Sequence, residues 1–176
     1  MYKGGIKLAL TKEEIQEAIK LGKKEEYYRK AFFRHYKFGT PVTFWESGMV
    51  FTKFSSLVFY SHIFGAVGKS IKPEEISAIL LDDNLGIIVS VVGTKANFLS
   101  GSWIHLEQGR KIIGATQTST EKQADPGIGF LSMPYHRWYI KGFFPYSKID
   151  LKAVTKIVVT KGKKKSIFYI NLSRCK

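Results

Sequence analysis

The stretch VTKIVVTKGKKKSIFYINL, residues 154–172, decides how the second half of this chain folds. Two runs rich in Val, Ile and aromatic residues flank a lysine-rich segment, in which Gly162 can supply the tight turn of a hairpin. On the second run Phe168 and Ile170 alternate with Tyr169, so one face of that strand should point into a core. The stretch therefore predicts a β-hairpin with a basic tip.

Strand-like segments continue upstream of this hairpin as far as residue 85. They are short and rich in β-branched or aromatic residues, and no helical periodicity separates them: LGIIVSVVG (85–93), SWIHLEQ (102–108), KIIGATQT (111–118) and RWYIKGFF (137–144). Strands spaced in this way, without intervening helices, are typical of antiparallel sheets. The polar stretch TQTSTEKQADPGIG, residues 116–129, is expected to be a long loop between strands.

The first forty residues have a different pattern. Thr11 and Glu14 form a capping box, the reciprocal pairing that begins a helix. Apolar residues then recur at helical spacing. Two helices are predicted, at 12–23 and 25–37, with a break at 39–41.

The segments between these two halves complete the expected architecture. Residues 42–54, VTFWESGMVFTKF, indicate a strand pair or one bent strand, and the apolar stretch 57–67 indicates a core element. The predicted fold class is α+β, with an N-terminal helical hairpin followed by a mainly antiparallel β-sandwich or barrel-like unit. A helical segment at 1–40 packed on a β-rich domain at 41–176 would form a single globular unit.

Residues 62–84, HIFGAVGKSIKPEEISAILLDDN, resemble a phosphate-binding loop followed by paired aspartates. A phosphate loop needs a glycine five residues before Gly68, and Ile63 stands there instead. The segment that follows is too short for the crossover helix of a nucleotide-binding fold. Gly65 and Gly68 are better explained as turn glycines beside a solvated Lys69. Pro73 can begin a short helix, or the segment can be a strand that turns near residue 83.

The net charge of +14 is concentrated in the second half of the chain. Residues 89–176 hold 15 Lys/Arg against 4 Asp/Glu, whereas residues 1–88 hold 13 against 10. Such an excess permits contact with nucleic acid or another polyanion, and it is also what a lysine-rich soluble protein needs for solubility.

Two places in the basic half are candidates for binding. If HRWYIK is a strand, its alternation puts Arg137, Tyr139 and Lys141 on one face, which could stack bases or sugars or be an ordinary wet face. The hairpin tip carries Lys163, Lys164 and Lys165, which could attract a polyanion or protect the sheet edge from aggregation. Together these six residues are the predicted binding surface.

The sequence predicts no catalytic residue, metal site or cofactor. Its four histidines lie far apart, and Cys175 is the single cysteine, so metal-ligand spacing is missing. No Gly-x-Ser-x-Gly turn is present, and the few carboxylates of the β-rich half suggest no catalytic pair. We therefore expect a protein that is not an enzyme.

Three segments resemble a group of uncharacterised exported bacterial proteins. They are LTKEEIQEAIKLGKK (10–24), VFTKFSSLVF (50–59) and FFPYSKIDLKAVTKIVVTKGKKKSIFYINLS (143–173). The resemblance implies an N-terminal helix, a C-terminal β-rich unit and a location in the periplasm or cell envelope. The first residues contain no apolar signal core, so the alternatives are a cytoplasmic protein or one whose leader has been removed.

Two functions from different classes follow. The first is a non-catalytic exported domain, a binding module for a protein or an envelope component. The second is a binder of nucleic acid or another polyanion through the basic half. No apolar stretch reaches the roughly 20 residues that a transmembrane helix needs.

Overall fold

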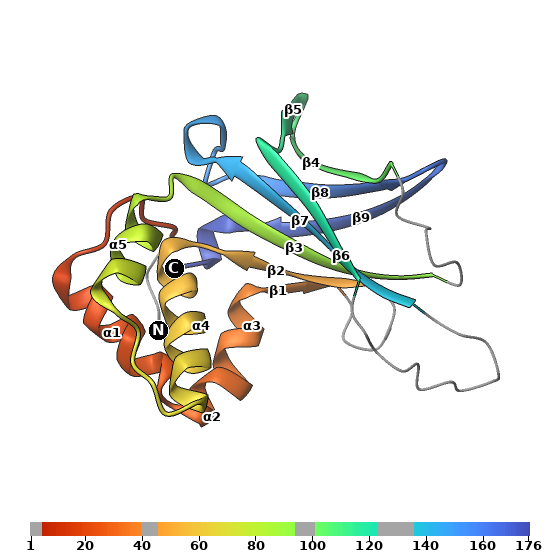
Figure 1. The fold of residues 1–176 in the computed structure, drawn as a ribbon. Coiled ribbons are helices and arrows are strands. Elements are labelled where there is room, and N and C mark those ends of the chain that lie inside the picture. Colours follow the sequence, from red (N-terminus) through yellow and green to blue (C-terminus); the bar gives the residue numbers. More distant parts are fainter. Residues whose placement is uncertain (1–4, 40–45, 94–100, 123–135) are drawn as a thin grey trace.

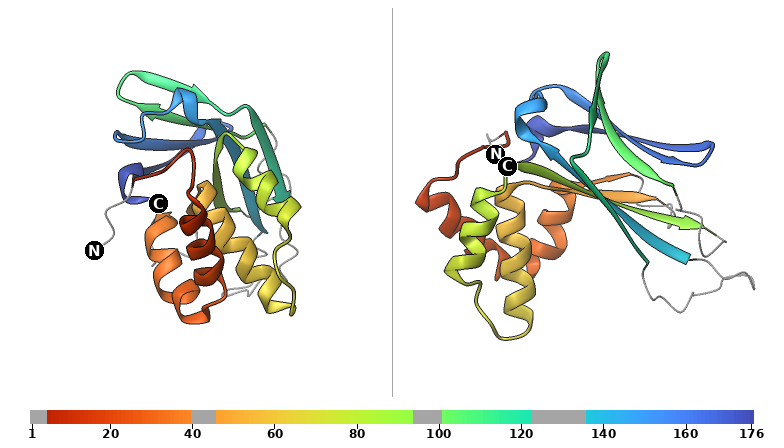
Figure 2. Two further views of the ribbon diagram at one scale, coloured as in Figure 1. Left: turned by 90° about the vertical axis from the view of Figure 1, so that its left-hand side faces the viewer. Right: turned by 45° about the horizontal axis from the view of Figure 1, so that its top comes forward.

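A computed structural model of the protein describes residues 5–39, 46–93, 101–122 and 136–176. In this structure two antiparallel sheets, one of five strands and one of four, pack together, and helices cover one side of the larger sheet. Figures 1 and 2 show this order of layers, with the helices on one side of the five-stranded sheet and the four-stranded sheet on the other. The predicted α+β class and the sandwich arrangement are confirmed.

The helical layer is built from two separate parts of the sequence. Its elements are α1 (Lys12–Gly22), α2 (Glu25–Tyr27), the π-helical turn η1 (Tyr28–Phe32), α3 (Phe33–Tyr36), α4 (Lys53–Ala66) and α5 (Pro73–Leu81). Both capping residues of α1 bond as the sequence predicts, with the Glu14 amide donating to Thr11 Oγ1 and the Thr11 amide to the Glu14 carboxylate. None of the helices in the described ranges is long and apolar enough to cross a membrane.

The strands form two sheets. Sheet A has the order β1 (Lys37–Gly39), β2 (Ser47–Phe51), β3 (Asn84–Gly93), β7 (His136–Pro145), β6 (Gln117–Lys122). Sheet B has the order β5 (Lys111–Gly114), β4 (Trp103–Gln108), β8 (Val154–Lys161), β9 (Lys164–Asn171). Short 3-10 turns, η2 (Tyr146–Lys148) and η3 (Leu172–Arg174), follow β7 and β9. All described strand pairs are antiparallel.

The two sheets meet through a tightly packed core. Ile140 of β7 is fully buried, and a side chain at Gly142 would lie 2.6 Å from a methyl group of Ile104 on β4. From residue 137 to residue 144, the even-numbered residues of β7 therefore face sheet B and the odd-numbered residues face away from it. The sheets keep separate strand orders in the described ranges, so the structure is a sandwich and not a closed barrel.

Close packing also joins the helices. Gly22 at the end of α1 lies so near α4 that a Cβ there would be 2.4 Å from the Val58 carbonyl oxygen. Ala18, one turn earlier, is fully buried. These small residues let the α1 and α4 backbones approach each other.

The C-terminal segment links the β-rich part to the helices. Cys175 is buried, and burial raises the pKa of its thiol to about 12. The carbonyl oxygen of Lys176 accepts hydrogen bonds from the side chains of Thr52 and Tyr36, and its Nζ pairs with Glu17. The last residues of the chain therefore hold α1, α3 and α4 together.

Three sequence predictions need correction. Residues 53–66 are helix α4, because Thr52 forms a capping box with Ser55 just where the predicted strand pair should continue. The segment 111–118 contains two strands, β5 and the start of β6. Residues 117–122 belong to β6, so most of the described part of the predicted 116–129 loop is a strand, and residues 123–129 lie outside the described ranges. An edge strand can be polar on both faces, which made β6 look like a loop.

Several other predictions are confirmed. The 154–172 hairpin forms, with Gly162 at φ 56°, and Phe168 and Ile170 point inward as expected. Residues 62–84 form no phosphate loop: Gly68 is a turn glycine at φ 71°, Lys69 is exposed, and Pro73 begins α5. The prediction of a second turn glycine at Gly65 was wrong, because Gly65 lies inside α4, which ends at Ala66.

Candidate functional site

Two adjoining cavities lie between the helices and the face of sheet A that is turned away from sheet B. Their volumes are about 590 and 750 Å³. Both are lined by Phe51, Phe59, Ile88 and Lys141, so they are treated as two chambers of one groove. Along β3 the groove runs from Asn84 to Ser90, a distance of about 20 Å at the usual rise of a strand.

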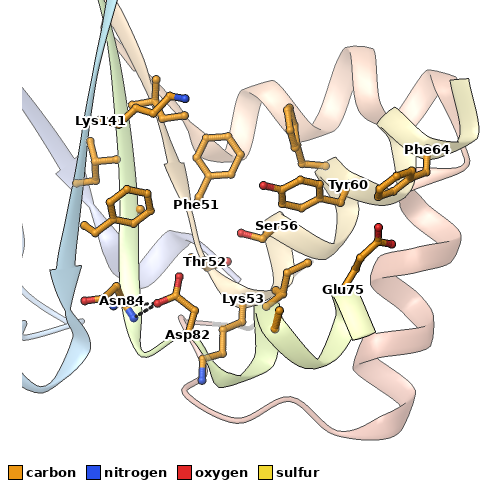
Figure 3. A pocket seen from close by; sticks show the side chains of 17 residues that line it. Phe51, Thr52, Lys53, Ser56, Tyr60, Phe64, Glu75, Asp82, Asn84 and Lys141 are labelled. Atoms are coloured by element: carbon orange, nitrogen blue, oxygen red, sulfur yellow. Dashed lines mark hydrogen bonds between the residues drawn. The ribbon is translucent and has the colours of Figure 1, made fainter. Parts of the chain in front are cut away.

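The first chamber is mainly apolar. In Figure 3, Phe51 and Lys141 extend from the sheet side toward Tyr60 and Phe64, which come from α4 on the opposite wall. Glu75 of α5 lies on the same wall as Tyr60 and Phe64. The remaining apolar lining comes from α5 and the sheet, namely Ala78, Ile79, Ile87, Ile88 and Phe143.

An aromatic contact between the sheet and α4 marks the junction of the two chambers. The rings of Phe51 and Phe59 meet edge to face, with centroids 5.3 Å apart. On the helical side the rings of Tyr28 and His62 stack with their centroids 3.6 Å apart. The His62 Nδ1 lies 3.3 Å from the Gly22 carbonyl oxygen. Burial, with Glu25 nearby, raises the pKa of the Tyr28 hydroxyl. These rings make the helical wall rigid, because each is held by a neighbouring ring or by the backbone.

The second chamber carries the positive charge of the groove. Lys37, Arg137 and Lys141 line it together with Glu121, which accepts a 2.6 Å hydrogen bond from Lys141. Within the described residues, Lys37 and Arg137 form no ion pair. One end of the groove therefore holds two cations without a described carboxylate partner, whereas Glu75 and Asp82 lie at the other end.

The carboxylates of the first chamber have structural partners. Glu75 accepts the Lys72 amide at 2.6 Å, where it caps α5, and Asp82 accepts the amide and side chain of Asn84. Lys53 is buried and donates to the Leu80 carbonyl oxygen at 2.6 Å. These groups hold helix ends in place.

The structure separates the six residues of the predicted binding surface. Arg137, Tyr139 and Lys141 do share one face of β7, but that face forms a wall of the second chamber and is not an open sheet surface. Lys163, Lys164 and Lys165 lie exposed at the β8–β9 tip, on sheet B. Because odd-numbered residues of β7 face away from sheet B, the two halves of the prediction do not form one site.

Sequence reasoning missed the residues of the helical wall. Phe59, Tyr60 and Phe64 lie in the stretch that was expected to be an undifferentiated core element. The capping box at Thr52 and Ser55 was the signal that could have identified α4. Once α4 is a helix, positions 60 and 64 share a face.

The described histidines are dispersed. His35 lies in α3, His62 in α4 and His105 in β4. The described residues contain no group of three or more His, Cys, Asp or Glu that could hold a metal ion.

Comparisons with protein-family models, with curated proteins and with solved structures find no match for this chain. A functional assignment therefore depends on the geometry and chemistry of the groove.

Proposed function

We propose that the protein is a non-catalytic binding domain whose groove takes an amphipathic molecule with an apolar body and one anionic group. The observation that carries this proposal is the polarity of the groove, with an aromatic first chamber and, in the second, Lys37 and Arg137, which form no ion pair with any described residue. Chambers of 590 and 750 Å³ are within the range of small-molecule sites, which are mostly apolar with a few polar groups.

The charges give the bound molecule a direction. An anionic group is favoured beside Lys37 and Arg137 and disfavoured beside Glu75 and Asp82. The apolar body would then lie against Phe51, with its end in the first chamber. Acyl chains with an acidic head, such as those of envelope lipids, have this chemistry.

Export to the periplasm or cell envelope is part of the same proposal, and it is supported by the sequence resemblance. Fractionation of cells that express the full-length native gene, followed by N-terminal sequencing of the mature protein, tests it. A cytosolic protein that retains its initiator methionine would contradict export and leave the groove proposal in place.

Binding of three detergents with the same chain length tests the groove. Titration calorimetry below the micellar concentration should show the highest affinity for the anionic dodecanoate. The neutral dodecyl maltoside should bind less tightly, and the cationic dodecyltrimethylammonium least tightly. Replacing both cations, Lys37→Gln with Arg137→Gln, should weaken dodecanoate binding at least about tenfold and leave maltoside binding unchanged, because losing even one hydrogen bond to a charged group costs about 1.5 kcal/mol.

The matched control is Lys164→Gln with Lys165→Gln, which removes the same charge at the distant hairpin tip. This control should bind dodecanoate with wild-type affinity. Equal losses in both double variants would mean that net charge, and not the groove, attracts the anion. Equal affinities of wild-type protein for all three detergents would also contradict the proposal.

A further inference from the structure

Exposed large hydrophobic side chains gather on the outer face of sheet B, the face turned away from sheet A. Half of the ten such residues in the described part of the chain lie on its strands: Trp103, Ile112, Val154, Ile167 and Tyr169. We call this surface the platform. Singly scattered hydrophobic residues need no explanation, but a cluster of this kind indicates a binding surface.

The strand register explains why these side chains point outward. On β9, Ser166, Phe168 and Ile170 are buried between the sheets, so Ile167 and Tyr169 face solvent. The same row contains Lys165, which is opposite Thr160, and Thr160 is in turn opposite Trp103.

Trp103 is held in a fixed orientation. Its ring stacks on His105 with centroids 4.4 Å apart and an angle of 20°. The His105 Nε2 donates to Glu107 Oε1 at 3.1 Å, and the other carboxylate oxygen accepts from Lys156 at 2.7 Å. Trp103 is still 48% exposed, so the platform offers an aromatic surface that needs little further ordering on binding.

The charge of the platform is positive. Glu107 is the single carboxylate in the sequences of the four strands, and the adjacent Lys156 neutralises it and, with His105, lowers its pKa. Lys161 pairs with Glu46. By contrast, Lys163, Lys164 and Lys165 at the hairpin tip form no ion pair with any described residue.

We propose that the platform binds single-stranded nucleic acid, with bases stacked on Trp103 and Tyr169 and phosphates beside Lys163, Lys164 and Lys165. Exposed aromatic rings interleaved with cations are what an unpaired strand requires, since every base has a π-face and every linkage a negative charge. A duplex hides its base faces, so charge alone would attract it. A second copy of this basic chain would bring the same lysines together, which disfavours self-association through the platform.

The dimensions fit more than one nucleotide. Trp103 and Tyr169 lie on strands two positions apart in sheet B and are offset by four residues along the strand direction. Strand spacing and rise place them roughly 16 Å apart. The lysine tip continues from the Trp103 end of this path.

The test compares polyanions that differ in their base faces. Fluorescence anisotropy measures binding to a labelled twelve-residue thymidine oligonucleotide, a matching duplex and heparin at 50, 100 and 200 mM salt. The single strand should bind most tightly. If about three phosphates are neutralised, its affinity should fall about 20-fold between 50 and 200 mM salt, and the triple Lys→Gln variant at 163–165 should remove most of this salt dependence.

Stacking is tested separately from charge. Trp103→Ala should weaken single-strand binding about tenfold, and Trp103→Phe should restore most of it. The matched control is Tyr60→Ala, which removes a ring of similar exposure, 45%, from the groove. It should not change oligonucleotide affinity.

Three outcomes would overturn the inference. They are heparin or duplex affinity equal to that of the single strand, an unchanged affinity in Trp103→Ala, or a dimer in solution that Trp103→Ala dissociates. Dodecanoate binding by the Trp103→Ala variant tests the groove separately, because the groove lies on the other sheet. Its dodecanoate affinity should stay at the wild-type value even if the platform proposal fails.

Discussion

The groove face of β7 and the outer face of β9 have similar sequences but different surroundings. One presents Arg137, Tyr139 and Lys141, and the other presents Lys165, Ile167 and Tyr169. Helices α3 and α4 face the first set across the groove, so it becomes one wall of a cavity. Sheet B has no such helical layer over its outer face in the described ranges, so the second set is a flat platform. Strand periodicity determines which residues share a face, and tertiary packing determines what that face can bind.

The largest expected effect comes from the core that both surfaces share. Ile140→Ala should lower the free energy of unfolding by about 2–5 kcal/mol, because it leaves a cavity between the sheets. Denaturant unfolding followed by tryptophan fluorescence and circular dichroism should show one transition at a lower midpoint. Ile112→Ala, at a position 67% exposed, is the control and should be close to neutral. Two separate transitions would mean that the groove and the platform belong to independently folding units.

A smaller effect should separate the two surfaces. Gly22→Ala places a methyl group against the α4 backbone, which should cost about 1–3 kcal/mol and displace the helical wall. Dodecanoate affinity, measured by calorimetry, should fall, while oligonucleotide affinity stays constant. Gly65→Ala is the matched control, because a Cβ there meets no atom within 4 Å. A parallel loss of both affinities in Gly22→Ala would show that the platform depends on the helices.

The smallest effect concerns the charge of the second chamber. Glu121→Gln removes the partner of Lys141 and should strengthen dodecanoate binding about two- to threefold, since an exposed ion pair contributes about 0–1 kcal/mol. Glu26→Gln, which removes a comparable exposed partner from Lys30, should have no effect. A weaker affinity in Glu121→Gln would mean that the anionic group does not approach Lys141.

Local rules predicted the elements whose signals lie within a few residues. The capping box at Thr11, the turn at Gly162 and the alternation on β9 each depend on neighbours in the chain, and each is confirmed. The prediction at residues 42–54 was partly wrong. Val50 and Phe51 do lie in a strand, β2, but the strand was expected to continue to residue 54, whereas helix α4 begins at Lys53. A polar edge strand, β6, was mistaken for a loop because pairing with β7, and not burial, defines it.

The sequence by itself determined the α+β class, the start of α1, the 154–172 hairpin and the alternation of faces along its second strand. Only the tertiary structure decided that α1 packs closely on α4 at Gly22, and that Arg137 and Lys163 lie on different surfaces. The physical reason is the distance along the chain over which each interaction acts. Capping, turns and side-chain alternation are fixed by covalent neighbours, whereas the groove and the platform arise from contacts between elements that are far apart in the chain.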